Sequence, residues 1–564
     1  MATTTTITSK EGITWNFINA VSYGQYITGD YWVLGPALVS SISPSTTLRP
    51  DSTAKNGTMF CHDLSSASQG LDGAVLLQYP YLSSLNVANY ISSSVPLVLS
   101  PGDRIVSVSS NASAPAIGKV SILTCVSSSN FDVSAFRPGY TDRTVDYVDG
   151  SALSAYNSKL ANFDLTQVLT KTEPSVSGLI NSVSSTWFDP FVGSNGRFIR
   201  PVGAMPYDDA LIAGTISNAA LALNYYRTGL DKPTLAKYLV QIGIDAYSDL
   251  VNLGLKWSDI GPQGSGKKFC ILFAGRMLDN QDYLDVGSDY QVSYGAQNVF
   301  PEDTQTFFIS SISSVINYGN GSYVASDVGI PEWGLTHWND SVFDTKDWVN
   351  TSSYGTDFRR FFSMKHWVGY LFASKIMGLQ NAWNHDPLFY YFNRYFAKEL
   401  ELVSSLSSTN VKEALAPSGM EWQYDFVSGL NSYYFPSDSS SRVSGVGFYG
   451  VGHNSSSLLY ASSTPSNDIL NLIVLNPLNS SGTVIAGSAT YGYTRNSASN
   501  TSSIVYVIPN TSIQYYLLES AADRLVYGIS LPSSDFHVQV IWYDNSGSIV
   551  ASTNALRIRD TVAF

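Results

Sequence analysis

The chain has 564 residues, and 31 basic against 44 acidic side chains give it a net charge of −13. Only 13% of the residues are charged, about half the usual share for a globular protein. This acidic chain without a basic stripe is not expected to bind nucleic acid. Hydrophobic residues make up 44% of the sequence, which excludes extended disorder. At roughly 150 residues per domain, the length of the chain suggests three or four domains.

No apolar run reaches the length of about 18 residues that a membrane-spanning helix needs. The N-terminus also lacks a charged segment followed by an apolar one, so no signal peptide is visible. The sequence therefore predicts a protein without a membrane span. Its neutral surface, rich in Ser, Thr, Asn and Tyr, fits an extracellular location or the surface of a virion or cell.

Residues 1–150 are predicted to form an N-terminal β-sandwich. Apolar side chains alternate with polar ones, as at Ile13, Trp15 and Phe17. The turn signal Ser100–Asp103 separates two apolar runs in the manner of a hairpin or sandwich turn. Antiparallel strands are therefore expected in this region.

A lead-in segment, 151–204, precedes a predicted helical domain over 205–435. Asp231 and Asp386 are expected to begin helices, and Gly229, Gly254 and Gly378 to end them. The apolar periodicity predicts helices over 208–228, 232–254, 266–279, 302–318, 356–377 and 387–402.

Residues 436–564 return to strand-like alternation and are predicted to form a C-terminal β-sandwich. The runs 469–475, 504–508, 513–518 and 525–531 are the main strands, and Asp544–Gly547 is a hairpin turn. The polar stretch Pro436–Arg442 is the predicted linker to the helical domain.

Three cysteines are too few for a disulfide framework, and Cys61 with Cys125 is the only plausible bridge. Nine Asn-x-Ser/Thr sequons would suit a glycoprotein. The alternative is that these sequons arise by chance, because the chain is rich in Ser and Thr. They occur at Asn56, Asn111, Asn320, Asn339, Asn350, Asn454, Asn479, Asn500 and Asn510.

The segment Gly261–Lys268 nearly matches a phosphate-binding loop. Lys268 replaces the hydroxyl residue that would hold magnesium, and no strand precedes the segment, so a nucleotide site is not expected. A glycine-rich turn with Lys267 in the first helical turn could still bind an anionic group. The alternative is a helix start whose glycines permit close packing.

Two pairs of acidic residues stand at predicted helix starts. Glu302 and Asp303 follow Pro301, and Asp208 and Asp209 follow Tyr207. Carboxylates at a helix N-terminus are stabilised by the macrodipole without any catalytic purpose. The functional interpretation is an acid–base pair at the rim of a sugar-binding cleft.

Arg359, His366 and Tyr370 share one face of a predicted helix. An Arg to neutralise a carboxylate and a His or Tyr to move a proton are what an acidic-polysaccharide site requires. The alternative is that His366 is an ordinary buried histidine.

No metal-binding motif is present, and the acidic series Asp279, Asp282, Asp285 and Asp289 lacks the glycine and terminal glutamate of a calcium loop. No metal and no cofactor are therefore expected.

Several stretches resemble a group of largely uncharacterised bacterial proteins with an N-terminal β domain and a helical centre. These are Tyr23–Tyr26, Gly29–Pro36, Gly264–Leu278, Glu302–Phe307, Gly329–Gly334 and Ala382–Phe389. The architecture of this group is similar to that of polysaccharide lyases and glycosidases built on an (α/α) toroid, which implies an (α/α)-toroid-like central domain. Gln263 departs from the group, in which a histidine is usual at this place; if that histidine is catalytic, activity has been lost here.

Two functional hypotheses follow. The first is a polysaccharide lyase or glycoside hydrolase that acts on an extracellular or cell-wall polysaccharide. The second is a non-catalytic structural or adhesion protein of a virion or cell surface, which would act as a homo-oligomer or within a virion assembly. For an enzyme, the predicted catalytic residues are His366, Tyr207, Asp208, Glu302 and Glu332, and the predicted substrate-binding residues are Arg359, Lys267, His337 and Trp333.

Overall fold

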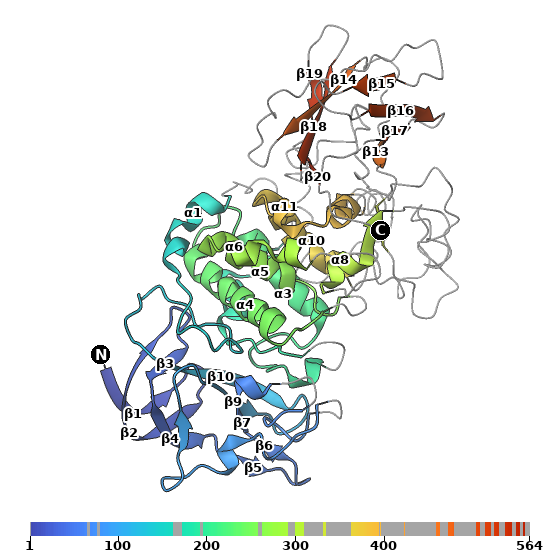
Figure 1. Cartoon of the computed structure of the whole chain (residues 1–564). Coiled ribbons are helices and arrows are strands. Elements are labelled where there is room, and N and C mark those ends of the chain that lie inside the picture. Colours follow the sequence, from blue (N-terminus) through green and yellow to red (C-terminus); the bar gives the residue numbers. More distant parts are fainter. Residues whose placement is uncertain are drawn as a thin grey trace.

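The computed structural model describes residues 2–64, 68–75, 79–161, 172–191, 196–257, 262–290, 299–308, 331–333, 363–393, 395 and 422–423, and the backbone of eight strands between 458 and 558. The protein is a mixed α+β chain, with a sheet in the N-terminal part and helices after about residue 150 (Figure 1). The predicted linker 436–442 lies outside the described residues. No helix within those residues is both long and apolar enough to cross a membrane.

The N-terminal strands form one curled sheet of eight strands, where the sequence predicted the two sheets of a sandwich. Its order is β7-β9-β10-β3-β2-β4-β8, with β1 paired to β2, and all pairs are antiparallel except β10 with β3. The bounds are β1 Ala2–Thr8, β2 Thr14–Gln25, β3 Tyr31–Leu34, β4 Ala37–Ser43, β7 Thr58–Phe60, β8 Leu97–Leu99, β9 Arg104–Ser110 and β10 Ile117–Val126. The predicted turn between β8 and β9 is confirmed, since the Asp103 amide donates to the Ser100 carbonyl at 2.9 Å, but the two strands do not form a hairpin, because β8 pairs with β4 and β9 with β7 and β10.

Both faces of this sheet are covered, because neighbouring residues of one strand enter different hydrophobic clusters. In β9, Ile105 packs in the cluster of Trp15, whereas Val106 packs in another cluster. Cys61 belongs to the cluster of Val106 and Cys125 to that of Ile105, and both are free thiols. The predicted disulfide is therefore wrong.

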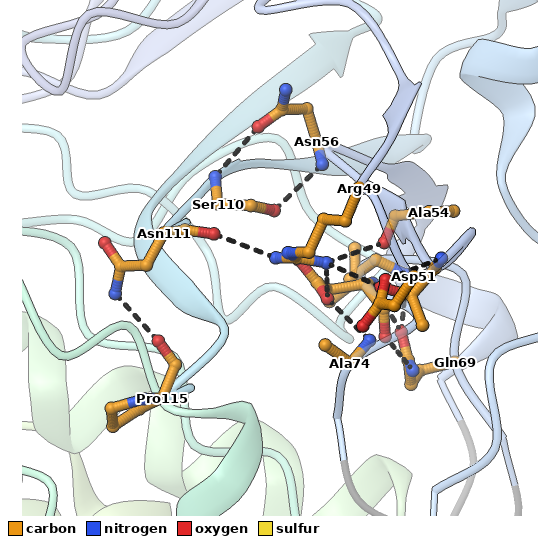
Figure 2. Close-up of polar contacts among 12 residues, drawn as sticks. Arg49, Asp51, Ala54, Asn56, Gln69, Ala74, Ser110, Asn111 and Pro115 are labelled. Carbon is orange, nitrogen blue, oxygen red and sulfur yellow. Dashed lines mark hydrogen bonds and ion pairs between the residues drawn. The ribbon is translucent and has the colours of Figure 1, made fainter. Parts of the chain in front are cut away.

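A polar cluster ties the short hairpin β5 (Thr47–Leu48) and β6 (Ala54–Lys55) to the rest of the sheet region (Figure 2). Arg49 forms a two-pronged ion pair with buried Asp72, at 2.8 and 2.7 Å. Beside it, the Asn56 side chain accepts a hydrogen bond from the Ser110 amide at 2.9 Å and donates one to the Ser45 carbonyl at 3.1 Å. A glycan on Asn56 would replace the second bond, so this sequon has a structural role in the fold.

The helices begin largely where the capping residues predicted. They are α1 Tyr156–Lys159, α2 Val176–Ser184, α3 Asp209–Ala222, α4 Lys232–Asn252, α5 Lys267–Leu278, α6 Gln281–Leu284, α7 Val286–Asp289, α8 Pro301–Gln305, α10 Lys365–Ile376 and α11 Gln380–Trp383, followed by helical residues 386–393. Asp231 caps α4 by accepting from the Thr234 amide at 3.0 Å. The predicted helix 302–318 is wrong in part, since α8 stops at Gln305 and β11 (Thr306–Phe308) pairs with β12 (Pro331–Trp333). The β-prone run of Thr306 and two phenylalanines favours this strand.

Two close helix pairs make up the helical core, α4 with α5 and α3 with α10. Each depends on a glycine. A Cβ on Gly243 would stand 2.1 Å from the Cys270 carbonyl, and one on Gly369 would stand 2.6 Å from the Ser217 Cβ. The second contact brings the chain around His366 and Tyr370 directly against α3, where Ser217 donates to the His366 carbonyl at 2.5 Å.

The sheet is joined to the helices by a row of polar side chains that we call the α4 polar face: Gln241, Asp245, Ser248 and Asp249. Arg137, which follows β10, forms ion pairs with Asp245 at 2.7 Å and with Asp30 at 3.3 Å. Tyr140 donates to Asp249 at 2.5 Å. All these groups are buried, so the junction consists of oriented polar contacts.

We expect Asp249→Asn to flatten the pH dependence of stability. Burial raises the pKa of Asp249 well above its ordinary value despite the hydrogen bond from Tyr140. The folded protein thus holds this proton more tightly than the unfolded chain does. Asp249 therefore lowers the free energy of unfolding as pH rises from about 4 towards the folded pKa, by about 1.4 kcal/mol per pH unit. Urea denaturation between pH 5 and 8 measures the free energy of unfolding of the parent protein and of Asp249→Asn. If this free energy changed with pH equally in both proteins, the expectation would be contradicted.

The C-terminal strands form two four-stranded antiparallel sheets. One has the order β13-β17-β16-β15; in the other, β14, β18 and β19 are joined by β20, which pairs with β18. Their bounds are β13 Leu458–Ser462, β14 Leu472–Leu478, β15 Ile504–Val507, β16 Gln514–Ser520, β17 Arg524–Gly528, β18 Phe536–Tyr543, β19 Ile549–Ser552 and β20 Leu556–Ile558. The four predicted main strands overlap β14, β15, β16 and β17, whereas the predicted turn Asp544–Gly547 lies outside the described residues.

Candidate functional site

Three segments that the sequence analysis singled out meet at the start of α5. The Gly264 amide donates to Asp209 at 3.0 Å, and the Gly266 amide donates to Glu302 at 2.7 Å. Both glycines have positive φ, +74° and +87°, a conformation that other residues rarely adopt. The two amides thus bind side chains of the protein itself, and a Cβ on Gly266 would stand 2.7 Å from Ile216, so the alternative of a helix start with closely packed glycines is confirmed.

The cations beside this turn are also paired internally. Lys267 contacts Asp189 at 2.8 Å, and Lys268 pairs with Asp303. Arg200 links Asp189, at 2.7 Å, to Asp209, at 2.8 and 3.1 Å. These three cations and three carboxylates form what we call the α5 charge network; all six side chains are buried.

The α5 charge network keeps Asp189 ionised. Burial alone would raise the pKa of Asp189, but Arg200 and Lys267 outweigh it and lower this pKa to about 2. Lys267, predicted to bind substrate, therefore already has a permanent anionic partner. An incoming carboxylate would have to compete with Asp189.

Glu302 differs from the other acids of the site. Its Oε1 accepts from the Gly266 amide and, at 2.9 Å, from the Tyr370 hydroxyl, whereas Oε2 has no hydrogen-bond partner among the described residues. Burial raises the pKa of Glu302 to about 7, although the Gly266 hydrogen bond lowers it. Because Oε1 already accepts two hydrogen bonds, the proton of the neutral acid belongs on Oε2. Glu302 can therefore give or take a proton near neutral pH.

Aromatic rings hold these acids in place. Tyr370 lies parallel to Trp383, with ring centroids 6.2 Å apart, and near Phe269 at 5.8 Å. Trp383 donates to Asp303 at 2.8 Å, and Lys268 lies over its ring at 5.4 Å. Tyr370 and Trp383 have no exposed surface, so their faces pack inside the protein instead of being open to a sugar.

Three other predicted site residues lie at the start of α3 and on α10. Asp208 is the exposed N-cap of α3 and accepts from the Ala210 amide at 2.9 Å. Tyr207 is half-buried and lies edge-on to Phe198 at 6.0 Å. His366 is buried on α10, one turn before Tyr370, and so lies in the same region as Glu302.

Strand β12 carries Glu332 and Trp333, whose backbones pair with Phe307 and Thr306 of β11. The backbone register thus connects Glu332 to the segment that follows Glu302. Arg359 and His337 lie outside the described residues.

Asp189 and Arg200 also belong to this cluster, although no sequence motif marks them as site residues. They lie in the turn-rich approach to the helical domain, far in sequence from α5. One signal was available, namely charged side chains next to Phe188 and Ile199 in a chain with few charges. Such residues are seldom buried unless they are paired.

Comparisons with family models, curated proteins and solved structures found no match to this chain. Within the described residues, no group of three or more His, Cys, Asp or Glu side chains could hold a metal ion. The expectation of a metal-free, cofactor-free site stays a prediction.

Proposed function

We propose that the chain is a carbohydrate-active enzyme, a polysaccharide lyase or glycoside hydrolase, in which Glu302 transfers the proton. The observation that carries this proposal is the state of Glu302: a buried acid with a pKa of about 7, one oxygen held by two donors and the other without a partner among the described residues. Perturbed acids of this kind concentrate at active sites. The architecture that the resemblance implies, which is similar to that of polysaccharide lyases and glycosidases, favours an extracellular or cell-wall polysaccharide as substrate.

The proposal includes a domain architecture. The helical region 205–435 would form an (α/α)-toroid-like domain between the N-terminal sheet and a C-terminal sandwich. The helix pairs α4–α5 and α3–α10 and the two C-terminal sheets are compatible with this arrangement. An extracellular, virion or cell-surface location belongs to the same proposal.

A screen of the purified protein against polysaccharides tests the proposal. We expect new reducing ends from at least one polymer between pH 5 and 7, where Glu302 is largely protonated. The heat-inactivated protein is the control. A complete lack of cleavage, by a protein that is folded by circular dichroism, would contradict the proposal.

The second candidate is a non-catalytic structural or adhesion protein of a virion or cell surface. Two observations favour it: the donors of the α5 turn are occupied by Asp209 and Glu302, and Glu302 is 0% exposed. A polymer could reach Glu302 only if the residues covering it moved apart. Glycan binding without any cleavage would support this candidate.

A further inference from the structure

We propose that the side chains of Lys268 and Asp303 condense to an isopeptide bond, a covalent amide between the two, with release of one water molecule. Lys268 lies on α5 and Asp303 on α8, 35 positions further along the chain, and their side chains form an ion pair. An amine beside a carboxyl group contains every atom that an amide bond needs. The bond would clip the first turn of α5 to α8, whatever the function of the protein.

The ion pair is enclosed by apolar rings. The side chains of Lys268 and Asp303 are 1% and 2% exposed. Lys268 Nζ lies 5.2 Å from the centre of the Phe300 ring and 5.4 Å from that of Trp383. In water, hydration of the two ions opposes condensation. In this interior the two charges instead carry a desolvation cost of several kcal/mol each, and a neutral amide removes that cost. Burial therefore favours the bond.

The two oxygens of Asp303 have different partners, which assigns each a part in the reaction. Oδ1 accepts a hydrogen bond from the Trp383 indole at 2.8 Å, and Oδ2 contacts Lys268 Nζ. Among the described residues, this carboxylate is the hydrogen-bond partner of Nζ. The indole N–H polarises the bond between Cγ and Oδ1 and can keep donating to the same oxygen in the amide. Oδ2 is thus the oxygen that leaves.

The condensation balances without a co-reactant. One ammonium proton passes from Nζ of Lys268 to Oδ2, and the neutral amine attacks Cγ of Asp303. A second proton then passes from Nζ to Oδ2, the bond between Cγ and Oδ2 breaks, and water leaves. Burial lowers the pKa of Lys268, although Asp303 raises it, which helps the first proton transfer. Well-oriented groups held in contact react as if present at roughly 10⁵–10⁸ M.

The neighbouring pair of the same chemical types is expected to stay ionic. Lys267 contacts Asp189 at 2.8 Å, and these side chains are 6% and 5% exposed. Asp189, however, is also bound by Arg200 at 2.7 Å, and the two cations lower its pKa to about 2. Its carboxylate cannot take up the lysine proton and stays an anion, which an amine does not attack. The second partner of Asp303 is the uncharged indole of Trp383.

Mass spectrometry of the purified full chain tests the proposal after incubation of the folded protein at neutral pH. We expect a mass lower than that of the sequence by one water molecule. A tryptic digest should contain a branched peptide that joins Lys268 to Asp303. Lys268→Arg keeps the positive charge but cannot form the bond, so it should have its full sequence mass. Lys267→Arg is the matched control at the next position and should still lose one water.

Two results would overturn the proposal. The first is a folded parent protein that keeps its full sequence mass. The second is a loss of water that the digest assigns to another place, such as Lys267 with Asp189. Both are read from the parent protein, so the decision stands even if a variant does not fold. Neither measurement uses a substrate, and a failure here would leave the proposed function to its own test.

Discussion

Glu302→Gln is expected to lower kcat/KM on a cleaved polysaccharide by at least ~10²-fold, because an amide cannot transfer the proton that Glu302 supplies. The amide oxygen can still accept from the Gly266 amide and the Tyr370 hydroxyl, so the geometry around Oε1 is kept. In the parent protein, activity should fall as pH rises through about 7, because the protonated form of Glu302 disappears. Initial rates of reducing-end release between pH 5 and 9 measure both effects.

A matched variant separates catalysis from folding. Glu11→Gln makes the same chemical change at a buried glutamate of the N-terminal sheet region, where Glu11 pairs with Lys119 at 3.3 Å. This variant should keep the parent activity. Glu302→Gln should also be at least as stable as the parent at pH 8, because ionised Glu302 destabilises the fold above its ordinary pKa. Full activity of Glu302→Gln would remove Glu302 from the proposed mechanism.

Arg137→Met is expected to lower the free energy of unfolding by about 3–5 kcal/mol, as is usual when one partner of a buried ion pair is removed. Arg137 is fully buried and is the shared partner of Asp30 and Asp245. Methionine preserves much of the volume, so the loss reports mainly Asp245, left without its cation, and Asp30, left with Lys10 alone at 3.9 Å. Urea denaturation followed by tryptophan fluorescence measures the change.

Arg143→Met is the control for this experiment. Arg143 pairs with Asp103 at 2.9 Å, but its side chain is 51% exposed. Water and salt screen such a pair, so we expect a loss below about 1 kcal/mol. If both variants lost the same free energy of unfolding, the buried ion pairs of Arg137 would stabilise the protein no more than the exposed ion pair of Arg143.

Much of the fold could be predicted from local patterns. The alternation at Ile13, Trp15 and Phe17 reports a buried strand face, and those residues do lie in one cluster. The start of α4 could be predicted because Asp231 acts on an amide three residues away. The closure of the N-terminal strands into one sheet could not, because the parallel pairing of β10 with β3 joins residues about 90 positions apart.

The segments that form the site could also be predicted from local patterns, but the contacts between them could not. Helix starts gather charged and glycine residues, so the segments around Asp209, Gly266 and Glu302 were found, and they do meet. What the sequence could not reveal is that these groups satisfy one another. That depends on Asp189 and Arg200, whose side chains reach the turn only through the tertiary fold. A pattern of acids and bases looks the same whether its partner is a substrate or another part of the chain.

The α4 polar face couples the unfolding of the sheet to the unfolding of the helices. Apolar surfaces can slide or be covered by another partner, whereas Arg137 and Tyr140 each require a particular carboxylate in a particular orientation. If α4 separated from the sheet, Asp245 and Asp249 would lose these partners at the same moment. Unfolding of either part therefore weakens the other, and the junction makes the two halves one cooperative unit.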